Sequence, residues 1–226
     1  MTHPVLADRS QLAAVCIDMG SVVVDEGLTW ARWRAAAVRH LKKNGVQITG
    51  PEFSRAIRAA MLARAPRITA HAFETLGVDP AAVAGVWRTV GNHDRPLAYA
   101  GAALARLATR YRLVMVANQG LHARGLLEGA GLHVHFNHLL LSEEIGVSKP
   151  DERIFRMALD HLELEPERVA MLGDRLDLDV EPSRRLGMLA VRIRRGPFSH
   201  QLHARPEETP HLTFNSLTNA ARWLAP

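Results

Sequence analysis

The 226-residue sequence contains little cysteine, little lysine and no long apolar run. Its single cysteine, Cys16, excludes an internal disulfide. No apolar run approaches the ~20 residues that a bilayer crossing needs, so we expect no membrane segment. The first twelve residues, MTHPVLADRSQL, lack the basic segment and the long apolar stretch of a secretory signal. We therefore expect a cytoplasmic protein.

Lysine is scarce even though the formal net charge is +5, because only three of the 28 basic residues are lysine. The arginines are scattered, and their densest group is the short stretch VRIRRG at 191–196. A nucleic-acid-binding domain concentrates its basic residues on one face or along one helix, so we expect no nucleic-acid partner. The sequence carries no signal for an oligomeric state.

Five short apolar segments are predicted to be strands, and helix-length amphipathic segments separate the later ones. The predicted strands are 13–17, 112–117, 138–141, 168–172 and 188–193. In one intervening segment, DERIFRMALDHLEL, the residues Ile154, Met157, Ala158 and Leu162 lie on one helical face. Strands that alternate with helices predict an α/β fold with a Rossmann-like parallel sheet covered on both sides.

A different pattern follows the first strand, where residues 29–91 contain helical periodicity and no convincing strand. Three helices are predicted, beginning at Thr29, at Gly50-Pro51 and at Asp79-Pro80, the last reaching about Gly91. We therefore predict an α-helical domain at 25–96, inserted into a Rossmann-like core made of 1–24 and 97–226.

Polar residues stand at or after the ends of the predicted strands. Asp18 follows AVCI, Asn118 follows LVMVA, Lys149 lies in SEEIGVSKPDERIF, and Asp174 and Asp179 lie in GDRLDLDV. Any one of them alone is more often a turn or capping residue. Because the carboxyl ends of parallel strands meet at one edge of a sheet, the set predicts one shared pocket. Carboxylates with water and substrate oxygens would suit Mg²⁺.

The order and spacing of these motifs resemble the haloacid dehalogenase-like (HAD) hydrolase superfamily. The apolar strand followed by D-x-D-G in that family is matched in part by CIDMGSVVVD. Its strand ending in Ser or Thr is matched imperfectly by VMVANQG. Its lysine before proline and its G-D-x-x-x-x-D motif are matched by GVSKPDERIF and GDRLDLDV. The resemblance covers nearly the whole chain, and the helical insertion lies where the family carries its cap domain.

The resemblance implies a nucleophile and a metal site. Asp18 would attack phosphorus and form an aspartyl-phosphate. Mg²⁺ would be held by the Asp18 carboxylate, the backbone carbonyl of Gly20 and Asp174, and Asp179 would support that site through water.

The resemblance also implies how an anionic substrate would be bound. Lys149 would pair with Asp18 and with the transferring group. Asn118 and the backbone amides after Asp18 would bind phosphate oxygens, and Ser21 belongs to this predicted substrate-binding set.

Two positions depart from the family pattern. Gly20 stands where phosphatases of the family have an aspartate as general acid and base, a type of group worth about 10²–10⁴-fold in rate. Ala117 stands where a hydroxyl would bind the phosphoryl group. Candidate replacements for the acid are Ser21, Asp25, Glu26, His71 and His93.

Three functions follow from this pattern. The first is a Mg²⁺-dependent hydrolase of a small phosphorylated or related anionic substrate, with altered phosphatase chemistry. The second is a catalytically impaired pseudoenzyme that binds a phosphorylated ligand or a protein partner. The third is cleavage of a C–P or C–halogen bond. A C–P hydrolase of this family needs a cap lysine, for which only Lys42 and Lys43 are available, and a dehalogenase usually has threonine where this chain has Val22.

Overall fold

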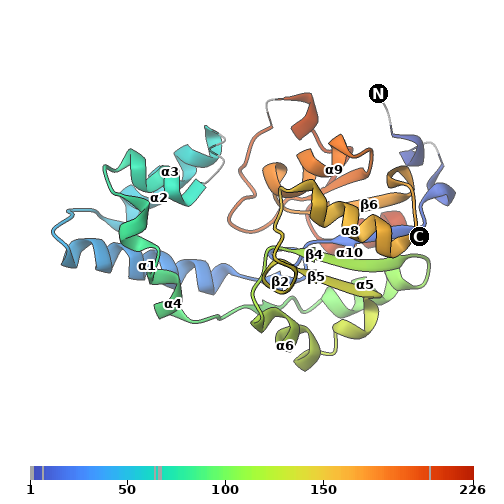
Figure 1. Ribbon diagram of the computed structural model, residues 1–226, viewed down its shortest axis with the longest axis horizontal. Helices are drawn as coiled ribbons and strands as arrows, with labels where there is room; N and C mark the ends of the chain where they lie inside the picture. Colours follow the sequence, from blue (N-terminus) through green and yellow to red (C-terminus); the bar gives the residue numbers. More distant parts are fainter. Residues whose placement is uncertain (1–2, 7, 64, 66–67, 204) are drawn as a thin grey trace. The chain divides into compact units, whose positions relative to one another are not determined.

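The computed structural model describes residues 3–6, 8–63, 65, 68–203 and 205–226 (Figure 1). The chain divides into two compact units. The first comprises Met1–Asp25, Arg95–Gly196 and His203–Pro226, and the second comprises Glu26–Asp94 and Pro197–Leu202.

The first unit contains a six-stranded parallel sheet in the order β5-β4-β1-β6-β7-β8. The strands are β1 (Ala14–Ile17), β4 (Arg112–Ala117), β5 (His138–Leu141), β6 (Val169–Gly173), β7 (Leu189–Ile193) and β8 (Leu212–Phe214). The five predicted strands are therefore confirmed, whereas β8 was not predicted. The three residues of β8 give too short a pattern to distinguish an edge strand from a loop.

Helices cover both faces of this sheet, which confirms the predicted Rossmann-like α/β architecture. One face, with Cys16 of β1, packs against α8 (Glu152–Leu162). The opposite face, with Val15 and Ile17, packs against α5 (Ala100–Ala108), α6 (His122–Gly129) and α10 (Leu217–Leu224). All four residues of β1 are buried, because a central parallel strand has apolar neighbours on both sides. Burial also raises the pKa of the Cys16 thiol to about 12, so this cysteine is a packing residue.

Shorter elements complete the first unit. Besides several 3₁₀ turns, they include α7 (Ser142–Ile145), α9 (Glu181–Arg185), the π-helical turn η6 (Leu176–Val180), and the antiparallel pair β2 (Val24–Asp25) and β3 (Arg95–Pro96). The β2–β3 pair joins the two stretches of chain on either side of the inserted helices.

The second unit is helical and contains α1 (Gly27–Lys43), α2 (Gly50–Leu62), α3 (Ile68–Thr75), the 3₁₀ turn η3 (Pro80–Val83) and α4 (Val86–Val90). The predicted start at Gly50-Pro51 is confirmed. There the Thr49 hydroxyl accepts from the Glu52 amide, and the Glu52 carboxylate accepts from the Thr49 amide, which together form a capping box.

Two of the predicted helices differ in detail, although Asp79 caps η3 as predicted. The first helix begins at Gly27, two residues before the predicted cap. Thr29 lies inside it, where its hydroxyl donates to Asp94 at 2.6 Å. The helix predicted from Asp79 to about Gly91 is interrupted and forms η3 and α4, with Gly85 capping the second piece. Glycine is a poor helix interior residue, which explains the interruption.

The core of the second unit is aromatic. Trp33 is 1% exposed and contacts Phe53, Phe73 and Trp87. Phe198, which comes from the segment Pro197–Leu202 far along the chain, also belongs to this core and contacts the ring of Trp30. The sequence pattern did not single out this segment.

Among the described residues, no helix is both long enough and apolar enough to span a membrane.

Candidate functional site

Three of the predicted site residues lie at the carboxyl ends of adjacent strands. Asp18 follows the central strand β1, Asn118 follows β4 on one side, and Asp174 follows β6 on the other. The Asp18 amide donates to the Leu172 carbonyl of β6 at 2.8 Å, so the sheet ladder continues to the site. Side chains placed at this edge of a parallel sheet converge, as the sequence predicted.

Lys149 links two of the carboxylates. Its Nζ lies 2.6 Å from Asp18 Oδ1 and 2.5 Å from Asp179 Oδ1, and all three side chains are buried. Burial alone would lower the pKa of Lys149, but the charges of Asp179 and Asp18 hold it above its ordinary value. The lysine therefore stays protonated and offsets part of the negative charge.

Asn118 fixes the main chain of Lys149. Its Nδ2 donates to the Lys149 carbonyl at 2.8 Å, and its Oδ1 accepts from the Lys149 amide at 2.7 Å. Both ends of the side-chain amide therefore position the lysine. The substrate contact that the sequence assigned to Asn118 stays a prediction.

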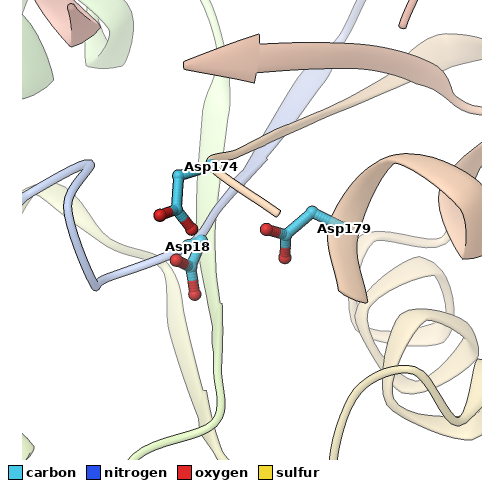
Figure 2. Close-up of side chains that lie close together, drawn as sticks. All are labelled: Asp18, Asp174 and Asp179. Carbon is cyan, nitrogen blue, oxygen red and sulfur yellow. The ribbon is translucent and has the colours of Figure 1, made fainter. Parts of the chain in front are cut away.

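Asp18, Asp174 and Asp179 form a compact carboxylate cluster (Figure 2). One oxygen of each lies within 4.8 Å of the others. In Figure 2 the Asp174 and Asp179 carboxylates point toward Asp18. The three carboxylates offer a buried donor set made only of oxygen atoms, which is the kind that Mg²⁺ takes. The residues present therefore fit a hard divalent cation.

The wide turn η6 returns Asp179 to the site. Its Oδ2 accepts from the Arg175 amide at 3.0 Å, while its Oδ1 accepts from Lys149. Asp179 is thus held at both oxygens, which suits a supporting role better than a direct ligand. Asp177 instead forms an ion pair with the Arg175 guanidinium. Its Oδ1 accepts from Nε at 2.8 Å, and its Oδ2 accepts from Nη2 at 2.5 Å.

The Asp179 side chain can lie against the end of β6 only because residue 173 is glycine. The sequence did not reveal this role of Gly173. A Cβ at residue 173 would collide with the Asp179 carboxylate. A glycine at the end of a strand often marks such an approach, and the Gly-Asp pair in GDRLDLDV carries that signal.

Burial raises the pKa of the Asp18 carboxyl to about 6. The charge of Lys149 opposes this rise and the charge of Asp179 adds to it. Above that pH the carboxylate is ionised and able to act as a nucleophile.

Both departures from the phosphatase pattern persist in the structure. Gly20 brings no side chain to the site. Ala117 is buried in the apolar core and offers no hydroxyl. Of the replacement acids, Asp25 is exposed and lies 3.4 Å from the guanidinium of Arg195. Ser21 is buried beside Asp174, and three others, Glu26, His71 and His93, belong to the helical unit.

Comparison with known proteins agrees with this geometry. A family model described as haloacid dehalogenase-like hydrolase matches residues 12–187, which include every strand end of the site. The chain belongs to this family. It therefore has the fold of the HAD proteins.

Among curated HAD relatives, the glyceraldehyde 3-phosphate phosphatase of Methanopyrus kandleri is 41% identical over 80 residues, covering 35% of this chain and 34% of that protein. The phosphoserine phosphatase of Thermus thermophilus is 44% identical over 94 residues, covering 42% and 36%. The chain thus matches only about a third of the length of these relatives.

Among solved structures, a HAD hydrolase of Bacillus subtilis bound to magnesium has a TM-score of 0.67 and 16% identity, covering 95% of this chain and 99% of that one. A HAD phosphatase of Thermococcus onnurineus has a TM-score of 0.61 and 21% identity, covering 94% and 98%. These likenesses concern the fold.

Proposed function

We propose that this HAD protein is a Mg²⁺-dependent hydrolase of a small phosphorylated substrate and uses Asp18 as its nucleophile. The observation that carries the proposal is the buried cluster in which Lys149 bridges Asp18 and Asp179 beside Asp174. Two curated relatives are named as phosphatases, which supports the substrate class.

In the proposed reaction, an Asp18 oxygen attacks phosphorus, and the bond from phosphorus to the leaving oxygen breaks, so that this oxygen takes its proton from solvent. Water then hydrolyses the aspartyl-phosphate, which releases phosphate and restores the Asp18 carboxylate. Mg²⁺ would be held by Asp18, Asp174 and the Gly20 carbonyl, and when bound it would neutralise charge on the transferring group. Lys149 keeps Asp18 oriented and adds a second positive charge. Asp179 holds Lys149 in place from the opposite side.

The helical residues 25–96 would act as a cap over the core formed by 1–24 and 97–226, excluding water and selecting the substrate. In the second unit, the aromatic core built around Trp33 gives these helices a packed centre of their own.

The absence of an acid at Gly20 limits which substrates turn over. Without a group to protonate the leaving oxygen, the rate must depend steeply on the pKa of the leaving alcohol. We therefore expect aryl or acyl phosphates to be cleaved far faster than alkyl phosphates.

The test is phosphate release with Mg²⁺ over a series of phosphomonoesters of increasing leaving-group pKa. Wild type and Gly20→Asp are compared, and Asp18→Asn is the blank. Gly20 has no left-handed backbone, so an aspartate there meets no conformational penalty. Gly20→Asp should raise the alkyl phosphate rate by about 10²–10⁴-fold and the aryl phosphate rate much less.

Other outcomes would argue against the proposal. A wild type that cleaves alkyl phosphates as fast as aryl phosphates would mean that another group donates the proton. No release by either protein, even from aryl phosphates, would favour the pseudoenzyme or the C–P and C–halogen alternatives instead.

A further inference from the structure

Ser21 holds a backbone conformation that serine rarely adopts. Its φ is 58°, and in the part of the chain that the structure describes only one other non-glycine residue, Glu163, has a positive φ. Glycine would adopt this conformation without steric cost. A strained residue beside a catalytic cluster points to a function for its side chain.

That side chain is a buried hydroxyl with unused hydrogen-bonding capacity. Ser21 is 2% exposed, and its Oγ has no hydrogen-bond partner among the described residues. A buried hydroxyl left without a partner is unfavourable and rare in folded proteins. The chain therefore retains both a strained backbone and an unsatisfied polar atom at one position.

The hydroxyl lies on the Asp174 side of the site. A Cβ at residue 196 would collide with Ser21 Oγ and would lie 3.9 Å from Asp174 Oδ2. Gly196 has a φ of 73°, which by itself favours glycine, and its missing side chain also leaves the space that the hydroxyl occupies. Ser21 thus points toward the β6–β7 side of the cluster, opposite the β4 side where Asn118 lies.

We propose that Ser21 is a positioning residue whose hydroxyl hydrogen-bonds a water ligand of the cation held by Asp18 and Asp174. This inference rests on the cation site of the proposed function. A serine hydroxyl does not ionise near neutral pH, so Ser21 orients a ligand and does not replace the missing acid of Gly20. Partners of this kind, one bond away from the metal, typically change metal affinity by about 10–100-fold.

The experiment measures Mg²⁺ binding by isothermal titration calorimetry without substrate, together with the melting temperature in EDTA. Ser21→Gly removes the hydroxyl and relieves the backbone, so it should melt higher than wild type in EDTA and bind Mg²⁺ about 10–100-fold more weakly. Ser21→Ala removes the unpaired hydroxyl but keeps the Cβ, so it should lose the same affinity and gain less in melting temperature than Ser21→Gly.

The matched control is Glu163→Gly, which relieves the other positive φ at an exposed position. It should raise the melting temperature and leave Mg²⁺ affinity unchanged. If wild type binds Mg²⁺ and both Ser21 variants bind it equally well, Ser21 has no role toward the ligand and only this inference fails. If wild type binds no Mg²⁺, the cation site itself fails, and the inference fails with it.

Discussion

The site concentrates negative charge in a place where water cannot screen it. Asp18, Asp174 and Asp179 are each less than 10% exposed, and Lys149 supplies the positive charge paired with two of them. Charges in such surroundings are costly unless they are paired, so each group depends on the others for its stability. The same arrangement that would hold a cation therefore makes the metal-free protein sensitive to single substitutions.

Lys149→Met tests this dependence. The change leaves Asp18 and Asp179 buried without their shared cation, and it should lower the free energy of unfolding by about 3–5 kcal/mol. Unfolding is measured in urea with EDTA at pH 8, above the pKa of about 6 that the Asp18 carboxyl has beside Lys149 in the wild type. Mg²⁺ should restore part of the loss, because a bound cation stabilises the folded state by mass action.

Lys42→Met is the matched control, because Lys42 is exposed in the last turn of α1. Its effect should stay within about 0.5 kcal/mol and should not respond to Mg²⁺. Equal stability of the two variants in EDTA would show that the Lys149 ion pairs contribute nothing to folding.

At the scale of residues, the sequence predicted the members of the site better than their connections. Asp18, Lys149 and Asp174 were found because each stands at a strand end or in a recognisable motif. The hydrogen bonds between the Asn118 side chain and the main chain of Lys149 join positions 31 residues apart, and no local pattern encodes them. The contact between Asp179 and Gly173 is likewise not encoded by a local pattern, because it forms only when the η6 turn brings Asp179 back to the end of β6.

At the scale of elements, the segment Pro197–Leu202 shows that the helical unit is not built from one stretch of chain. Phe198 is 6% exposed in a core otherwise contributed by residues of Glu26–Asp94. The centroid of its ring lies 5.4 Å from that of Trp30, in the edge-to-face arrangement that aromatic pairs prefer. The helical unit therefore owes part of its stability to residues that follow β7.

Phe198→Ala should destabilise the helical unit selectively. Removing a buried phenyl ring costs about 3–5 kcal/mol, and the loss falls on the core around Trp30. Hydrogen–deuterium exchange should speed up in α1 and in 197–202, while the amides of β1 and β6 keep their protection. Leu202→Ala, at a side chain 55% exposed in the same segment, should leave exchange unchanged. Uniform loss of protection across both units would show instead that they unfold together.

The elements that the sequence predicted are those with long or continuous apolar patterns. β1 and β4 were found because buried parallel strands read as apolar runs, and α2 because Gly50-Pro51 gives a clear start. The start of α1 and the interruption before α4 were missed. At the start of α1, the hydrogen bond from Thr29 to Asp94 overrides the capping signal of Thr29, whereas the interruption before α4 follows from Gly85.

At the scale of the whole molecule, His211 makes the sheet sensitive to acid. Its Nδ1 accepts from the Ala190 amide at 3.0 Å and its own amide donates to the Ala190 carbonyl at 2.9 Å, so the neutral ring secures the chain beside β7. Burial, with the charge of Arg184 adding to it, lowers the pKa of His211 to about 4. Protonation of Nδ1 would remove the acceptor that the Ala190 amide uses.

As the pH falls from 6.5 to about 4, His211 becomes protonated in the unfolded chain but stays neutral in the folded chain. Stability from this residue is therefore complete above pH 6.5, is lost as the pH falls toward 4, and changes no further below that. His211→Asn keeps an acceptor in place of Nδ1 and does not titrate, so its melting temperature should fall less than that of wild type over this range. Because the imidazole is only half-buried, we expect the free energy of unfolding of wild type to fall by about 1 kcal/mol more than that of His211→Asn by pH 4. His203→Asn, at an exposed histidine, should follow wild type, and parallel curves for wild type and His211→Asn would show that His211 does not govern the acid limb.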